Sequence, residues 1–148
     1  MSAEERELVL KAMEMVGKAY APYSHFQVGA AVRAASGKIY GGANVENASY
    51  GATVCAERNA IAAAVNAGER HLTAIAVAGG KDGVVSDFCP PCGLCRQVMR
   101  EFADPKAFKV ILAKSAADVR AFALDGLLPE SFGPEALGGL PESEPKDE

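Results

Sequence analysis

The chain has 148 residues, of which 49% are apolar and 23% are charged, and its formal net charge is −4. This length and composition predict one globular domain with a buried core, and they exclude a disordered or fibrous chain. The acidic balance and the scattered basic residues argue against a dedicated binder of nucleic acid polymers, which would neutralise phosphates with clustered Lys and Arg. No apolar run approaches the roughly 20 residues that span a bilayer, and the N-terminus lacks a signal-peptide pattern, so we expect a cytoplasmic protein without a membrane partner.

The first predicted element is an amphipathic helix over residues 2–20, in which apolar side chains recur at helical spacing. Ser2 and Glu5 have the spacing of a capping box, which satisfies free N–H groups at a helix start. Pro22 is expected to end the helix, because the residue before a proline is biased towards extended conformations. This helix is expected to pack its apolar side on the core.

A hairpin is predicted next, with strands over residues 26–32 and 39–43 joined by a Ser-Gly-Lys turn. The polar residues 44–51 predict an irregular loop. Residues 55–67 are rich in alanine and predict a helix that ends at Gly68. Its small side chains would let the helix backbone approach a sheet closely.

The remaining strands are predicted over residues 74–78, 108–113 and 119–123. The glycine cluster at residues 79–83 is interpreted as a plain turn, because it lacks the pattern and the context of a phosphate loop. Another helix is predicted to open in the cysteine-rich run and to continue through Phe102.

Strands that alternate with helices predict an α/β layered domain, in which the two cysteine-bearing helices connect pairs of parallel strands. We expect this single domain to cover residues 1–137. Residues 138–148 are rich in Pro, Glu and Lys and are expected to form a disordered acidic tail.

Four cysteines in a chain without an export signal favour metal binding or redox chemistry over disulfides. Cys92 and Cys95 are three residues apart in the first turn of a predicted helix, so both sulfurs can reach one ion. Cys55 begins another predicted helix and would supply a third thiolate if the two helix starts meet. The positive ends of both helix dipoles would then partly offset the thiolate charge.

Three protein ligands leave a fourth tetrahedral position for water, which is typical of a catalytic zinc site. Zinc can bring the pKa of that water from 15.7 to roughly 7. Glu57 lies two residues after Cys55, where it can take the proton of the water and deliver it to a leaving group. Arg58 is placed to hydrogen-bond the thiolates and so to reduce the negative charge that the zinc ion feels.

Two alternatives stay open for the cysteine-rich run. Cys89 as a fourth ligand would make a closed four-cysteine structural zinc site, and a pair of Cys89 with Cys92, or of Cys92 with Cys95, would be a redox motif. We favour a buried, apolar Cys89, because the two prolines after it form a rigid turn that points its thiol away from the helix start. The two histidines, His25 and His71, are expected to be structural or surface residues.

Several motifs resemble the cytidine deaminase family: Phe-Gln-Val-Gly-Ala-Ala at 26–31, Asn-Val-Glu-Asn-Ala at 44–48, Cys-Ala-Glu at 55–57, Pro-Cys-Gly-Leu-Cys-Arg-Gln at 91–97, and Leu-Leu-Pro at 127–129 with Phe132. Cys-Ala-Glu followed by Pro-Cys-x-x-Cys is similar to the signature of zinc-dependent deaminases. The resemblance reaches from the N-terminus to about residue 137. A short chain whose first ligand is cysteine is similar to the homotetrameric branch of that family.

The resemblance implies a three-layer α/β/α sandwich with a mixed five-stranded sheet, and one zinc ion per subunit. Cys55, Cys92 and Cys95 would bind the zinc ion and Glu57 would move protons.

The resemblance also implies how a nucleoside is held. Phe26 would stack on the pyrimidine, and the backbone around Ala56 would contact the base. Asn44 and Glu46 would hydrogen-bond the ribose hydroxyls.

The active site would be shared between subunits of a homotetramer. The residues that would complete a neighbouring subunit's pocket are Tyr50 and Phe132.

The expected reaction is hydrolytic deamination of cytidine and 2′-deoxycytidine to uridine and 2′-deoxyuridine, in which zinc-bound hydroxide attacks C4 while Glu57 protonates N3. A nucleoside is favoured over a free base, because a free base has no sugar hydroxyls for Asn44 and Glu46. It is favoured over a nucleotide, because Glu46 would repel a 5′-phosphate. The alternatives are a blasticidin-S-type antibiotic deaminase and a non-enzymatic zinc module closed by four cysteines.

Overall fold

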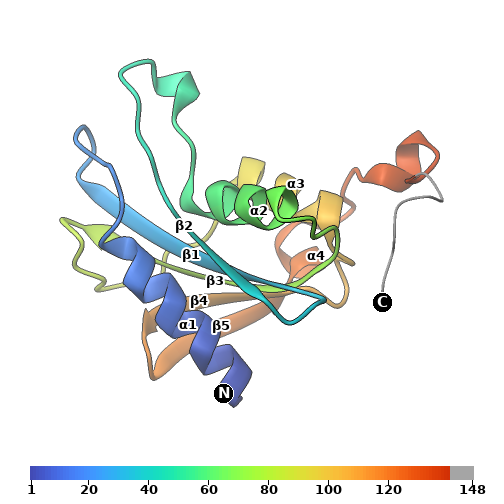
Figure 1. Cartoon of the computed structure of the whole chain (residues 1–148), viewed down its shortest axis with the longest axis horizontal. Helices are drawn as coiled ribbons and strands as arrows, with labels where there is room; N and C mark the ends of the chain where they lie inside the picture. Colours follow the sequence, from blue (N-terminus) through green and yellow to red (C-terminus); the bar gives the residue numbers. More distant parts are fainter. Residues whose placement is uncertain (141–148) are drawn as a thin grey trace.

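The computed structural model describes residues 1–140, and its centre is a five-stranded sheet with the strand order β2-β1-β3-β4-β5 (Figure 1). The strands are β1 (Phe26–Ala34), β2 (Ile39–Ala43), β3 (Leu72–Lys81), β4 (Lys109–Ser115) and β5 (Asp118–Ala123). β3 and β4 pair in parallel and the other neighbours pair antiparallel, so the predicted mixed five-stranded sheet is confirmed.

Helices cover both faces of this sheet (Figure 1). The α-helices are α1 (Ala3–Val16), α2 (Ala56–Asn66), α3 (Gly93–Phe102) and α4 (Leu124–Leu127), and two 3-10 helices are η1 (Tyr50–Ala52) and η2 (Pro134–Leu137). One core cluster joins the apolar side of α1 to one face of the sheet, and a second joins α2 and α3 to the other. The three-layer prediction is therefore confirmed.

Glycines in the first two strands explain how closely the helices approach the sheet. A Cβ atom at Gly29 would lie 2.2 Å from the carbonyl oxygen of Ala12 in α1, and one at Gly42 would lie 2.3 Å from the amide nitrogen of Ala60 in α2. Neither contact is sterically possible, so both positions require glycine. The alanine-rich composition of α2 thus has the packing role that the sequence suggested.

The predicted capping box is confirmed, but α1 ends at Val16 and not near residue 20. Glu5 donates its N–H to the Ser2 hydroxyl, and the Ser2 N–H donates to the Glu5 carboxylate, both at 3.1 Å. At the other end, the Tyr20 N–H donates to the carbonyl of Asn44, and the Tyr20 carbonyl accepts from Glu46. These long-range bonds draw Tyr20 into a bridge with the loop after β2 and out of the helix.

The prediction that each cysteine-bearing helix connects paired parallel strands is right for α3 and wrong for α2. α3 joins β3 to β4, which pair in parallel. α2 joins β2 to β3, which are separated by β1 because the short hairpin turn keeps β1 and β2 adjacent.

The glycine cluster at residues 79–83, which was predicted to be a plain turn, is partly a strand. β3 continues to Lys81, with Gly79 and Gly80 paired to Val28 and Gln27 of β1.

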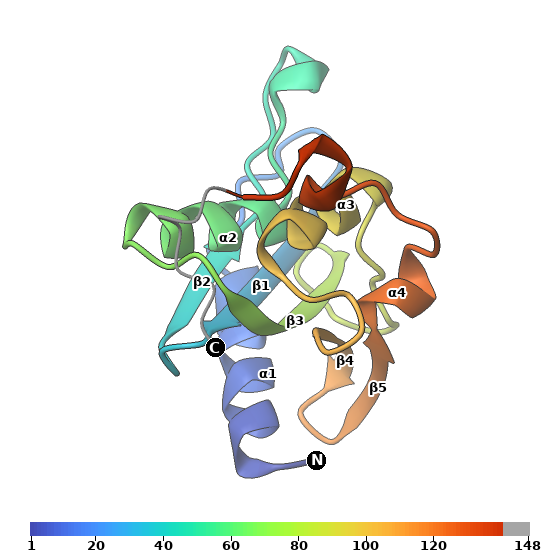
Figure 2. The same cartoon turned by 90° about the vertical axis from the view of Figure 1, so that its right-hand side faces the viewer.

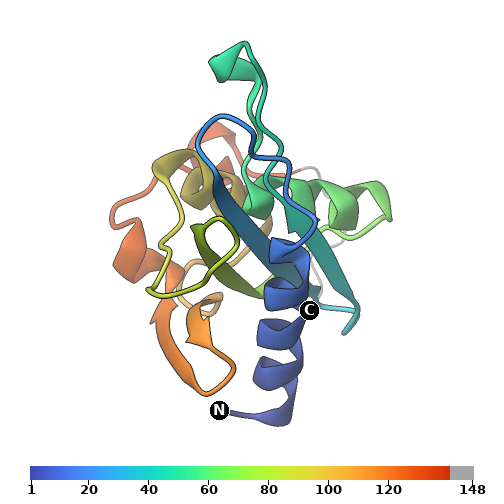
Figure 3. The same cartoon turned by 90° about the vertical axis from the view of Figure 1, so that its left-hand side faces the viewer.

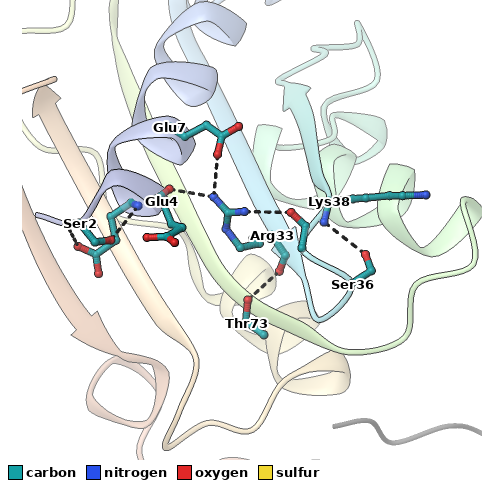
Figure 4. Close-up of polar contacts among 9 residues, drawn as sticks. Ser2, Glu4, Glu7, Arg33, Ser36, Lys38 and Thr73 are labelled. Atoms are coloured by element: carbon teal, nitrogen blue, oxygen red, sulfur yellow. Dashed lines mark hydrogen bonds and ion pairs between the residues drawn. The ribbon is translucent and has the colours of Figure 1, made fainter.

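Arg33 at the end of β1 ties the hairpin tip to the start of α1 (Figure 4). Its Nη1 donates to the carbonyl of Gly37 and its Nη2 to the carbonyl of Glu4, both at 2.9 Å. Nη2 also lies 3.3 Å from the Glu7 carboxylate, and the Thr73 hydroxyl donates to the Arg33 carbonyl. This network fixes the start of α1 against the end of the sheet where β1 turns into β2.

Across residues 1–140, every helix is too short or too polar to cross a lipid bilayer. The expected domain ends within the described residues. Most of the expected tail, residues 141–148, lies outside them.

Candidate metal centre and active site

Three thiols meet where α2 and α3 begin. Cys55 is the N-cap residue of α2, Cys92 is the N-cap residue of α3, and Cys95 lies in the first turn of α3. The Sγ atoms of Cys55 and Cys92 are 4.0 Å apart, those of Cys92 and Cys95 are 3.7 Å apart, and all three lie within 4.8 Å of one another. Four sulfurs around one zinc ion at 2.3 Å would lie roughly 3.8 Å apart, so this spacing fits a shared tetrahedral ion.

Hydrogen bonds from the neighbouring Cys95 thiol and from Arg58 favour the thiolate form of Cys55. A hydrogen bond from the Cys95 thiol, followed by one from Arg58, lowers the pKa of Cys55 to about 5, while the same pairing raises the pKa of Cys95. Arg58 Nη2 lies 3.6 Å from the Cys55 sulfur and donates to the Thr53 carbonyl at 3.3 Å. Its buried Nε has no hydrogen-bond partner within residues 1–140. Arg58 thus contacts the sulfur of Cys55, one of the three thiols that it was predicted to reach.

Cys89 lies outside this group of thiols, which comprises Cys55, Cys92 and Cys95 among the described residues. Its sulfur packs against β3, 3.2 Å from where a Cβ atom of Gly79 would stand. Burial, together with the nearby Glu57 carboxylate, raises the pKa of the Cys89 thiol to about 11. A half-buried thiol that lies outside the group of three sulfurs disfavours a closed four-cysteine site.

Glu57 is a buried carboxyl on the first turn of α2, with 4% of its surface exposed. Burial, and then the charge on Cys55, raise its pKa to about 7. A carboxyl whose pKa is close to neutral pH can both accept and donate a proton, which is what a proton shuttle requires.

Of the residues predicted to contact the sugar and base, Phe26, Asn44 and Glu46 lie at or beside the start of β1, and Ala56 lies at the start of α2. Phe26 is the first residue of β1 and 41% exposed, and Ala56 is the buried first residue of α2. The side chain of Asn44 accepts from the Val28 N–H and donates to the Phe26 carbonyl, both at 2.8 Å. One amide hydrogen and one oxygen lone pair of Asn44 remain for a ligand, because the side chain has four hydrogen-bonding positions.

Glu46 is held from one side by the loop before β1. Its Oε1 accepts the N–H of Tyr23 at 2.9 Å and that of Ser24 at 3.1 Å, and its Oε2 accepts the Ser24 hydroxyl. These bonds, led by the hydroxyl, lower the pKa of Glu46. Sequence reasoning missed Ser24, since a serine in a turn usually makes only local bonds.

Tyr50 lies at the tip of an arm, residues 44–54, that projects from the body of the molecule (Figures 2 and 3). The ring is 76% exposed and meets Tyr23 edge-on, with 6.1 Å between the ring centroids. A cavity of about 410 Å³ adjoins it, and the described lining residues are Tyr23, Ser24, Glu46, Asn47, Tyr50 and Thr53.

Phe132 is 61% exposed and belongs to the strap, residues 128–137. Three side chains of α3 that the sequence did not single out as functional hold the strap and the residue before it. Gln97 donates to the Phe132 carbonyl at 2.9 Å, and Arg96 donates to the Leu127 carbonyl just before the strap at 2.6 Å. Arg100, on the same helix, pairs with the Glu135 carboxylate at 2.8 Å. The metal cluster and the strap are thus attached to one helix.

A mixed sheet whose helix starts gather three thiols beside a buried carboxyl defines a zinc-binding hydrolase of the α/β class. Comparison with known sequences agrees. Residues 2–111 match the family model described as the cytidine and deoxycytidylate deaminase zinc-binding region. The chain belongs to this family.

Relatives match over most of their length. The chain is 44% identical to a cytidine deaminase of Halalkalibacterium halodurans, with 90% of this chain and 98% of the relative covered. It is 41% identical to a cytidine deaminase of Sporosarcina psychrophila, with 88% of this chain and 93% of the relative covered. The crystal structure of a cytidine deaminase from Burkholderia pseudomallei superposes with a TM-score of 0.78 at 44% identity, covering 89% of this chain and all of that one.

Proposed function

We propose that this chain catalyses hydrolytic deamination of cytidine and 2′-deoxycytidine, giving uridine or 2′-deoxyuridine and ammonia. The observation that carries the proposal is the cluster of Cys55, Cys92 and Cys95 beside the buried Glu57. The relatives named cytidine deaminase support the same substrate.

Cys55, Cys92 and Cys95 would hold the zinc ion as thiolates. A bound zinc ion supplies a Lewis acid that makes water nucleophilic at neutral pH. Three thiolates and one Zn²⁺ carry a net charge of −1. The Arg58 guanidinium and the N-terminal ends of α2 and α3 offset this charge, which keeps the ion acidic.

Glu57 moves the protons of the reaction. Its carboxylate takes a proton from the attacking water and passes it to N3, while the water oxygen bonds to C4 of the pyrimidine. Glu57 then passes the second water proton to the exocyclic amine, the bond between C4 and that nitrogen breaks, and ammonia leaves. A pKa of about 7 suits a group that must alternate between the two protonation states.

The start of β1 and the loop after β2 would bind the nucleoside. Phe26 offers an exposed ring for stacking, and Ala56 offers backbone groups at the start of α2. Glu46 and the remaining positions of Asn44 would bind sugar hydroxyls. A charged Glu46 disfavours a 5′-phosphate, so a nucleoside fits better than a nucleotide.

A homotetramer with shared active sites is part of this proposal. Tyr50 and Phe132 are large, exposed aromatic side chains on segments at the periphery of the subunit, which is the distribution expected of side chains that enter a neighbour's pocket. A cytoplasmic location, without a membrane or nucleic acid polymer as partner, stays a prediction.

A substrate panel tests the proposed function. Purified zinc-loaded protein is incubated with cytidine, deoxycytidine, cytosine, dCMP and blasticidin S, and loss of the cytosine absorbance is followed together with ammonia release. We expect turnover of both nucleosides and little of the others. Turnover confined to blasticidin S would favour the antibiotic deaminase, and no turnover of any substrate would favour a non-enzymatic module.

A further inference from the structure

The hydroxyl of Ser24 bonds the backbone of one residue and the side chain of another, and these two residues are proposed to hold opposite ends of the substrate. It accepts the backbone N–H of Phe26 at 3.0 Å and donates to Oε2 of Glu46. Phe26 is the proposed stacking residue and Glu46 the proposed sugar-binding residue. The Ser24 hydroxyl therefore connects the residue proposed to bind the base with the residue proposed to bind the sugar.

We propose that Ser24 is a positioning residue that orients the Glu46 carboxylate towards a sugar hydroxyl of the bound nucleoside. This inference rests on the proposed function, because it assigns a supporting residue to the same site.

Counting lone pairs shows what the hydroxyl contributes. Oε1 of Glu46 already accepts two backbone N–H groups, from Tyr23 and Ser24, while Oε2 accepts the Ser24 hydroxyl. A carboxylate oxygen has two lone pairs, so Oε2 keeps one for a ligand. Without the hydroxyl, hydrogen bonds would hold only Oε1. The carboxylate could then rotate about Oε1, and Oε2 would have no fixed position.

The backbone that follows Ser24 is held by hydrogen bonds, so the position of the Ser24 hydroxyl is fixed. The next residue, His25, has a left-handed backbone with φ of 60°. Its N–H donates to the Ala21 carbonyl at 3.0 Å, and its carbonyl accepts the Asp82 N–H at 2.6 Å. Bonds on both sides keep this conformation, which residues other than glycine seldom adopt.

The bonded pair is also accessible to a small molecule. Ser24 is exposed, Glu46 is half-buried, and both line the cavity of about 410 Å³ beside the arm. The Ser24 hydroxyl bond is the largest cause of the lowered pKa of Glu46, so it helps to keep the carboxylate charged and accepting.

Ser24→Ala and Ser24→Thr test the proposal, with Ser115→Ala as the matched control. Ser115, the last residue of β4, likewise accepts a nearby backbone N–H through its hydroxyl, in this case from Ala117 in the turn that follows. We expect Ser24→Ala to raise KM for cytidine about tenfold with kcat nearly unchanged, because the hydrogen bond that a sugar hydroxyl donates to the charged Glu46 carboxylate is misdirected. Ser24→Thr, which keeps a hydroxyl, and the Ser115 control should behave as wild type.

Product binding separates this inference from the proposed function. Calorimetry measures the affinity of each zinc-loaded variant for uridine and for 2′,3′-dideoxyuridine, and Ser24→Ala should weaken only the first. If that variant binds uridine as wild type does, or weakens both ligands equally, Ser24 does not position Glu46. If wild type binds uridine in the expected pattern but does not deaminate cytidine, the proposed reaction fails while the role of Ser24 stands. If wild type neither binds uridine nor deaminates cytidine, both fail.

Discussion

The two ends of the candidate site are built differently. At the metal end, the thiols and Glu57 stand on the first turns of α2 and α3, packed against the sheet, and Cys95 and Glu57 are buried. At the sugar end, Glu46 belongs to the projecting arm and is held by hydrogen bonds from another loop. Bond-making thus relies on the starts of helices that pack against the sheet, whereas recognition relies on partly exposed loops. Substitutions at the metal end should abolish the reaction, and those at the sugar end should only weaken binding.

Cys92→Ala should have the largest effect. Loss of one of three thiolates is expected to release most of the zinc and to lower turnover more than about a thousandfold, because an amino-acid side chain cannot replace a Lewis acid that ionises water. Elemental analysis for zinc and the absorbance assay measure both. A variant that kept zinc and full turnover would contradict the assignment of this cysteine as a ligand.

Glu57→Gln should come next. The amide keeps the size of the side chain but cannot move protons, so kcat should fall by about 10²- to 10⁴-fold while zinc stays bound. Glu69→Gln is a suitable control, because this carboxylate bonds Ser36 and Tyr40 away from the thiols. Near-normal activity of the Glu57 variant would rule out the proton shuttle.

Phe132→Ala tests whether the sites are shared. Each variant, Phe132→Ala or Glu57→Gln, should be poorly active alone. Subunits of the two, mixed and reassembled, should recover part of the wild-type rate, because some sites would combine an intact Glu57 with an intact Phe132 from another subunit. Light scattering gives the mass of the assemblies. Mixtures that are no more active than the average of their components would show that each subunit works alone.

Glu46→Ala should have a graded effect at the sugar end. Removing a charge-assisted hydrogen bond should raise KM for cytidine by about 10- to 100-fold with a much smaller change in kcat. Steady-state kinetics separate the two constants. An unchanged KM would place Glu46 outside the sugar site.

Cys89→Ala should have the smallest effect. Because its sulfur packs against β3 and outside the cluster, zinc content and ammonia release should both persist. Loss of zinc in this variant would instead support the closed four-cysteine site.

Much of this protein was determined by sequence alone. Local spacing brings Cys92 and Cys95 onto one helical turn, the capping box of Ser2 and Glu5 begins α1, and the alanine-rich run predicts the close packing of α2. These features depend on residues a few positions apart, so periodicity and capping rules reveal them.

Only the tertiary structure decided how distant segments meet. It placed β1 between β2 and β3, drew Tyr20 out of α1 towards the arm, and joined Ser24 to Glu46. It also attached the strap to α3 through Arg100 and Gln97. Each of these contacts pairs groups that are far apart in the chain. Their partners depend on how the packed layers bring backbone and side-chain groups together, and no local pattern encodes that.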